Sequence, residues 1–245
     1  MRTKVALPIL LLALLPLRAS ALEAPDTLRA NWGVLVESLT NPALSSHVSS
    51  PSINFNFGAG ISMLFAPESR WSFAPSADIY YYYGEFNSGQ PVATDEAFSS
   101  TFVLGLLLNA PAVYSIPLSP QITVSAGAGL CLDLRFAFNS GDLDAGAAKA
   151  SNAYFWGMAR FLTPSTVLRF EYKLTERVGF GFSGRVLWPV YNLWTGEGYG
   201  FFDQGKYLLS LVVRYKLKAP VDSSAGDAGA PAAPAAAPVA APASP

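Results

Sequence analysis

Few residues in this chain could carry out catalysis. His47 is the only histidine and Cys131 the only cysteine. His47 precedes Ser49 by two positions, so a base and a hydroxyl nucleophile stand at short spacing. A catalytic triad also needs a carboxylate that orients the base, and residues 45–49 contain none. We therefore expect no catalytic site.

The sequence also lacks the usual patterns of bound groups. It shows no ligand spacing for zinc, no phosphate-binding loop and no calcium loop. A single cysteine excludes an internal disulfide, and Cys131 is expected to be a small buried residue. The chain is thus predicted not to be an enzyme and to have no cofactor and no metal.

The charged residues form a more regular set. When the chain around them is read as β-strand, they stand opposite rows of apolar residues. If the strands close into a barrel, this arrangement predicts a lumen lined by four acids and seven bases. These residues form a salt-bridged plug, line a narrow polar path or make a closed floor beneath an outer pocket. The set is Arg29, Glu37, Asp78, Asp133, Arg135, Arg169, Glu171, Lys173, Arg185, Arg214 and Lys216.

The clearest strand has an apolar residue at every second position. The apolar row is Ile122, Val124, Ala126, Ala128, Leu130, Leu132, Leu134, Phe136 and Phe138. Its length is that of a strand that crosses a bilayer with one face toward lipid and the other toward a polar lumen. Similar patterns predict strands at residues 28–38, 52–65, 71–83, 97–109, 153–161, 166–174, 178–188 and 207–217.

A soluble β-sandwich would produce the same alternation, but it would place its charges outward. Strand length, the aromatic residues near strand ends and the N-terminal segment favour a membrane barrel. We therefore predict an all-β fold: a closed antiparallel transmembrane barrel built as an up-and-down meander of eight strands. Ten strands result if the breaks near 163 and 176 are both hairpins and 193–202 is another strand.

Connection lengths predict the orientation. Outer-membrane barrels have short periplasmic turns and long outer loops. The long connections are 39–51, 84–96, 139–152 and 189–205. They alternate with connections at 66–70, at 110–120 and at one of the two short breaks, near 163 or near 176. Both ends of the mature chain are then periplasmic.

The two ends of the chain differ from the rest. Residues 1–21 read as a signal peptide, with Arg2 and Lys4 before an apolar run and Ala19-Ser20-Ala21 as the cleavage site. Residues 22–218 form the predicted barrel. Residues 219–245 are almost entirely Ala, Pro, Gly and Ser, which predicts a disordered periplasmic tail. The net charge of −1 argues against a nucleic-acid partner.

With signal, strands and tail in place, residues 22–218 resemble the small outer-membrane barrels typified by outer membrane proteins A, X and W. The stretch Ser210-Leu211-Val212-Val213-Arg214-Tyr215-Lys216-Leu217 is similar to their insertion signal, but lacks its glycine and terminal Phe. The tail resembles the linker after the barrel of protein A. The pair His47 and Ser49 resembles the His-x-Ser pair of outer-membrane lipid A deacylases, where that pair lies on a strand facing the membrane.

The resemblance implies a place in the outer membrane of a Gram-negative type envelope. It implies lipid, periplasmic chaperones and the barrel-insertion machinery as partners. It leaves two functions open: a narrow porin-like channel for passive uptake of small hydrophobic molecules, or a non-transporting adhesin or structural protein that acts through its outer loops. The partner would be a small hydrophobic ligand in the first case and a host surface in the second.

Overall fold

The computed structural model describes residues 22–38, 52–87, 90–94, 101–139, 155–194, 201–202 and 204–217. His47, the predicted signal peptide and the predicted tail lie outside these ranges. No helix in the described ranges is long and apolar enough to cross a bilayer. The strands are β1 (Thr27–Glu37), β2 (Ser52–Leu64), β3 (Trp71–Phe73), β4 (Ser76–Asn87), β5 (Gln90–Thr94), β6 (Thr101–Pro117), β7 (Ile122–Asn139), β8 (Leu162–Lys173), β9 (Val178–Leu187) and β10 (Lys206–Lys216), with two 3-10 turns, η2 (Gly157–Ala159) and η3 (Val190–Leu193).

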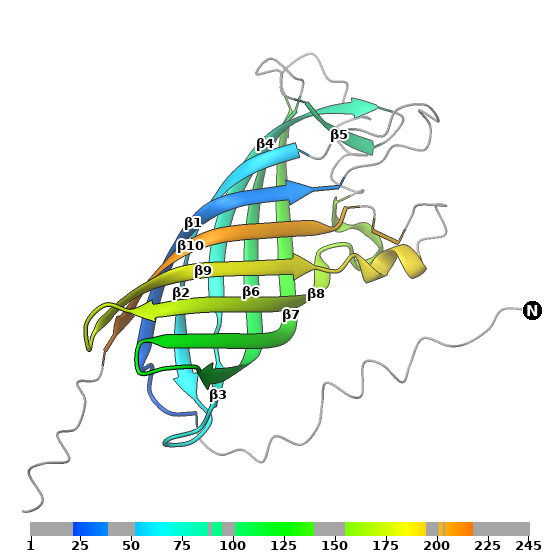
Figure 1. Ribbon diagram of the computed structural model, residues 1–245. Coiled ribbons are helices and arrows are strands. Elements are labelled where there is room, and N and C mark those ends of the chain that lie inside the picture. The colour runs from blue at the N-terminus through cyan, green and yellow to red at the C-terminus, as the bar shows by residue number, and fades with distance from the viewer. Residues whose placement is uncertain are drawn as a thin grey trace, which may run out of the picture.

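The strands close into a barrel (Figure 1). Each strand pairs antiparallel with its neighbours, and β1 pairs with β10 from Thr27–Lys216 to Glu37–Lys206. The short β3 and the longer β4 both pair with β2 on one side and with β6 on the other, so they occupy one strand position of the ring. The strand β5 pairs with β4 alone. The ring therefore has eight places, which confirms the eight-strand meander rather than the ten-strand alternative.

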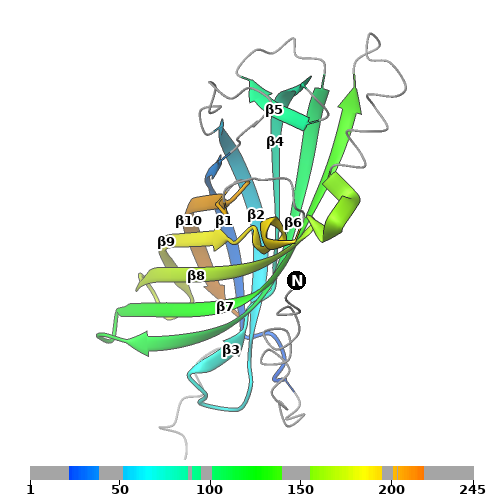
Figure 2. The same ribbon diagram turned by 90° about the vertical axis from the view of Figure 1, so that its right-hand side faces the viewer.

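The two ends of the barrel differ. At the terminal end lie Thr27, Lys216 and the short connections 65–70, 118–121 and 174–177. The long connections, from β1 to β2, β5 to β6, β7 to β8 and β9 to β10, start and finish at the opposite end, here called the loop end. Figure 2 shows β4, β6 and β7 rising further at the loop end than β8 to β10, with β5 at their tips.

The prediction for the fourth strand was wrong in its bounds. The predicted strand 97–109 continues to Pro117, and the predicted connection 110–120 is reduced to a turn at residues 118–121. Pro111 reads as a strand breaker, yet it lies inside β6. The Pro111 carbonyl accepts a hydrogen bond from the Ala74 N–H, and Ala74 lies between β3 and β4. The nitrogen of a strand residue points to the same side as its carbonyl, so the Pro111 nitrogen, which has no proton, faces a place where the hydrogen-bond ladder is already interrupted.

The break near 163 is not a hairpin, and the predicted strand 153–161 was also wrong. Its described part contains η2, where Met158 and Ala159 have φ of 53° and 58°, values that a strand excludes. Pro164 instead lies within β8. Its carbonyl accepts the Trp188 N–H just beyond the end of β9, so the missing proline donor costs the ladder nothing there.

The apolar faces of the strands turn outward and the charged faces turn inward, as predicted. Phe55, Leu132 and Leu211 project outward with exposed fractions of 64%, 37% and 42%, whereas Arg135 is inside at 1%. Exposed aromatic pairs lie toward both ends, Trp71 against Tyr114 near the terminal end among them. A bare apolar wall around a charged interior is stable only in hydrocarbon, so the chain is an integral membrane barrel.

Candidate functional site in the lumen

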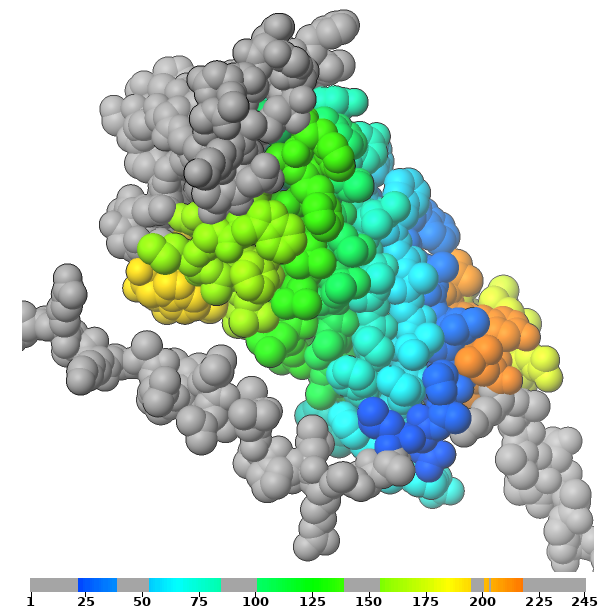
Figure 3. Space-filling view, turned by 180° about the vertical axis from the view of Figure 1, so that it is seen from behind, coloured from blue at the N-terminus to red at the C-terminus, as the bar shows by residue number. Residues whose placement is uncertain are grey.

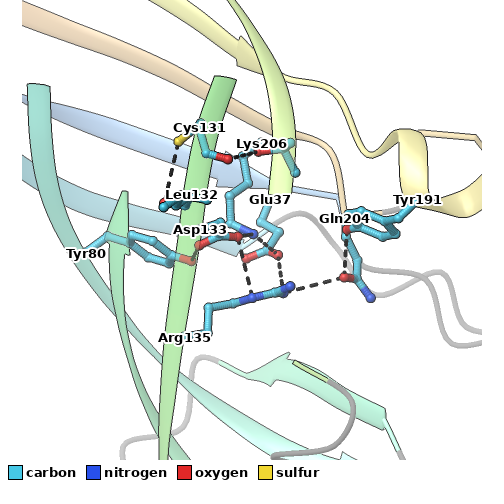
Figure 4. A network of polar contacts seen from close by, with 10 residues as sticks. Glu37, Tyr80, Cys131, Leu132, Asp133, Arg135, Tyr191, Gln204 and Lys206 are labelled. Carbon is cyan, nitrogen blue, oxygen red and sulfur yellow. Dashed lines mark hydrogen bonds and ion pairs between the residues drawn. The ribbon is translucent and has the colours of Figure 1, made fainter. Parts of the chain in front are cut away.

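Four charged side chains meet inside the barrel near the loop end; we call Glu37, Asp133, Arg135 and Lys206 the four-charge network (Figure 4). They come from β1, β7 and β10. The Lys206 Nζ lies 2.5 Å from Glu37 Oε1 and 2.9 Å from Asp133 Oδ2. The Arg135 guanidinium lies 3.6 Å from Glu37 Oε1 and 3.5 Å from Asp133 Oδ2. Two acids and two bases thus balance in a buried site.

Aromatic side chains hold this network in place. The Tyr80 hydroxyl donates a hydrogen bond to Asp133 Oδ1 at 2.8 Å, and its ring stacks on Tyr82 at 6.3 Å. The Tyr80 ring lies over Gly105, where any side chain would occupy the same space. The inward glycine therefore makes room for the tyrosine that fixes Asp133.

The loop-end side of the network is covered as well. The Arg135 guanidinium lies 4.6 Å from the centre of the Phe155 ring. Its Nη1 donates to Gln204 Oε1 at 3.5 Å, and the Tyr191 hydroxyl donates to the same oxygen at 3.0 Å. Apolar side chains fill the remaining interior at this level; they are Leu35, Val103, Leu107, Cys131, Leu187 and Leu208.

A second cluster lies further toward the terminal end. The Arg185 guanidinium donates to both oxygens of Asp78, at 2.6 and 3.1 Å, in a fork-like pair. The Asn31 amide donates to Asp78 Oδ1 at 2.5 Å, and Ser76 lies 3.5 Å from the other oxygen. The Asp78 carboxylate is therefore fully occupied.

A third cluster gathers around Glu171. Arg29 Nε donates to Glu171 Oε1 at 2.9 Å, and a second nitrogen of Arg29 donates to the Ser62 hydroxyl. Arg214 approaches Glu171 Oε2 at 3.9 Å. Arg169 is buried on the same strand as Glu171, with 8% of its surface exposed. Among the described residues its guanidinium forms no hydrogen bond and no ion pair.

Two hollows accompany these clusters. One, of about 210 Å³, opens at the terminal end and is bordered by Glu171, Lys173, Glu176, Arg214 and Lys216 among others. The other, of about 20 Å³, lies deeper and is bordered by all three guanidiniums of Arg29, Arg169 and Arg185.

The eleven predicted residues thus fall into separate groups. Nine of them lie in the three clusters. Lys173 and Lys216 border the terminal opening instead, where Lys173 Nζ donates to Glu176 Oε1 at 2.9 Å. That bond holds the pKa of the exposed Glu176 below its usual range.

Sequence reasoning missed Lys206, which makes the shortest contacts of the four-charge network. The last strand was predicted to begin at Tyr207, whereas β10 begins one residue earlier. Tyr207 faces outward, so the same alternation places Lys206 inward. Gln204 and Tyr191 gave no signal, because they lie outside the strands, Tyr191 in η3 and Gln204 just before β10, where alternation does not apply.

Of the candidates for catalysis, the structure describes Cys131 alone. His47 and Ser49 lie outside the described residues. Cys131 is buried, and its thiol lies 3.8 Å from the Leu132 carbonyl. The described residues contain no group of three His, Cys, Asp or Glu side chains that could hold a metal ion. That the chain is not an enzyme stays a prediction.

The outer wall carries an apolar groove of about 960 Å³. Its floor follows alanines on neighbouring strands, since Ala59 pairs with Ala30 on one side and with Ala77 on the other. Larger side chains such as Leu28 and Leu132 stand around them. The groove lies on the face of β10, β1, β2, β4, β6 and β7, which Figure 3 presents to the viewer.

No protein-family model matches the chain, and no curated sequence is similar enough to it to count as a match. Among solved structures, Neisserial surface protein A matches with a TM-score of 0.50 and 14% identity, over 79% of this chain and 99% of that one. Outer membrane protein OprG from Pseudomonas aeruginosa matches at 0.40 and 11%, over 79% and 98%. Ail of Yersinia pestis, solved with a heparin analogue, matches at 0.37 and 8%, over 79% and 99%. The fold is that of the small outer-membrane β-barrels.

Proposed function

We propose that this protein is a non-conducting outer-membrane barrel that acts at the cell surface, as an adhesin or a structural protein, through the connections at its loop end. In this arrangement the terminal end faces the periplasm, because small barrels place their short turns there. Outer-membrane lipid and the insertion machinery are then its partners in the envelope.

The buried four-charge network is the observation that carries this proposal. It crosses the lumen from β1 and β10 to β7, and every one of its side chains is almost fully buried. An eight-stranded barrel is only wide enough for its side chains to fill. Tyr80 and Leu107 belong to the buried cluster beside the network, which supports a lumen that is closed at this level.

Planar-bilayer recording of the refolded protein tests the proposal. We expect the native chain to conduct no ions. The double variant Glu37→Ala with Arg135→Ala removes one acid and one base, so the lumen keeps its net charge and loses its plug. That variant should show discrete openings. Steady conductance by the native chain, or a silent double variant that is folded, would contradict the proposal.

Passage of small hydrophobic molecules is a second candidate, and one observation favours it. The apolar groove and the deep hollow have five lining residues in common, so a thin stretch of wall separates lipid from lumen; they are Arg29, Gly60, Ile61, Pro75 and Ser76. Loading of an apolar dye into vesicles that contain the protein distinguishes the two candidates. Uptake above that of empty vesicles would favour transport, and its absence would favour the surface role.

A further inference from the structure

Arg169 is a buried cation that forms no ion pair with any described carboxylate. Its side chain leaves β8 toward the lumen, and only 8% of the residue is exposed. Within the described part of the chain the guanidinium has neither a hydrogen-bond partner nor an ion-pair partner. A guanidinium has five N–H donors and keeps its charge at all ordinary pH values. Burying such a group without a partner is strongly unfavourable.

The two carboxylates in this region are already in use. Glu171 stands two residues away on the same face of β8, but Arg29 binds it at 2.9 Å and Arg214 approaches it at 3.9 Å. Asp78 accepts two bonds from Arg185 and one from the Asn31 amide. Four guanidiniums therefore share two carboxylates, which leaves two positive charges in excess, and Arg169 is the guanidinium that forms no ion pair.

The hollow beside Arg169 has the size of one small ion. Its volume is about 20 Å³, and it is bordered by Arg29, Arg169 and Arg185 together with the polar side chains of Asn31 and Ser183. A space of roughly 10–15 Å³ on this measure holds one water molecule. A halide ion is similar in size, whereas a phosphate or a carboxylate with its carbon atoms is too large.

We propose that this hollow binds a single halide-sized monovalent anion, of which chloride is the common representative. The anion accepts hydrogen bonds from Arg169 and lowers an excess of positive charge that the two carboxylates of this region leave. A water molecule would fill the same space, but it would carry no charge to lower that excess. The ion is thus a structural part of the terminal half of the lumen.

Bromide replacement tests the proposal on the native protein. Crystals grown in sodium bromide should show an anomalous scattering peak in the hollow, within about 3.5 Å of the Arg169 guanidinium, as expected for a hydrogen-bonded contact. Crystals grown in sodium gluconate should show none. A hollow without an anomalous peak in bromide would overturn the proposal.

Thermal unfolding gives a second, independent measurement. Replacing gluconate by chloride at constant ionic strength should raise the unfolding midpoint of the native chain in a saturable manner, by about 2–4 °C at a few times the dissociation constant. Arg169→Gln should lose this response. Arg177→Gln, which alters an exposed arginine in the turn before β9, should keep it.

If Arg169→Gln does not fold, Arg169→Lys takes its place, because it keeps the charge and shifts the donors. A reduced chloride response in Arg169→Lys supports the site. An identical chloride response in the native chain and in the Arg169 variants would overturn it, since the stabilisation would then come from elsewhere.

Discussion

At the loop end of the lumen, each charge of the four-charge network has a partner of opposite sign, whereas toward the terminal end guanidiniums outnumber carboxylates. Glu37 and Asp133 face Arg135 and Lys206. The other half holds four arginines, Arg29, Arg169, Arg185 and Arg214, for the two acids Asp78 and Glu171.

The packing differs in the same way. The loop-end half is filled by aromatic and aliphatic side chains, whereas both hollows bordered by charged side chains lie in the other half. A balanced and filled half needs no ligand to be stable. A half with excess charge and free space is suited to hold a small solute. On our two proposals, the loop-end half closes the lumen and the other half binds an ion.

The largest expected effect comes from Lys206→Met. This change keeps most of the volume but leaves Glu37 and Asp133 with one cation between them. Breaking a buried pair costs about 3–5 kcal/mol, and the free energy of unfolding in urea, followed by tryptophan fluorescence, should fall by that amount. Lys216→Met, at the terminal opening of the same strand, is the matched control. An equal loss of unfolding free energy in Lys206→Met and Lys216→Met would show that the four-charge network stabilises the barrel no more than the charges at the terminal opening do.

Gly105→Ala should also destabilise the filled half. Its new methyl group would overlap the Tyr80 ring, and overpacking of this kind costs about 1–3 kcal/mol. Gly184→Ala on β9 meets nothing within 4 Å, so its urea midpoint should match that of the native chain. If Gly105→Ala is as stable as Gly184→Ala, the Tyr80 ring does not pack tightly against Gly105.

Arg169→Met should have the opposite sign to Lys206→Met, although both changes replace a buried cation by the same residue. In gluconate, removal of an unpaired charge should raise the free energy of unfolding by about 1 kcal/mol or more. Urea unfolding of both variants in the same buffer makes the comparison. A loss of stability in Arg169→Met would mean that Arg169 has a protein partner and that the two halves are alike.

The smallest effect is expected at the terminal rim. Because Lys173 donates to Glu176, the pKa of that carboxyl is lowered, and its contribution is present at neutral pH and lost as the pH falls through the lowered pKa. Glu176→Gln should therefore leave the urea midpoint unchanged at neutral pH, because exposed ion pairs contribute little. In Lys173→Met, an NMR titration should find the Glu176 pKa back in its usual range. A Glu176 pKa that is unchanged in Lys173→Met would contradict the contact.

Much of the fold was predictable, because alternation is a local property of the sequence. The row from Ile122 to Phe138 determines which face of β7 meets lipid, and each charge on that strand follows from it. The errors arose where segments that contain a proline, 110–120 and the break near 163, were predicted as connections. Pro111 and Pro164 both lie inside strands, since their missing donors face interruptions in a neighbouring strand, which local sequence does not reveal.

The candidate site was less predictable. Alternation shows that Asp133 and Arg135 face inward, but not which of the other strands' charges they meet. That depends on how far each strand is shifted against the next around the ring. Pairing of Arg185 with Asp78, and the isolation of Arg169, result from that shift and from the lengths of the side chains.

The antiparallel seam between β1 and β10 joins the first and last strands of the described chain. Until β10 is in place, both β1 and β9 expose a full row of unpaired amide and carbonyl groups, which hydrocarbon does not tolerate. Assembly in the bilayer is therefore all-or-none: a nascent polypeptide must be kept from aggregating through these edges until its final strand arrives. We expect a nascent chain to need a chaperone for that whole interval.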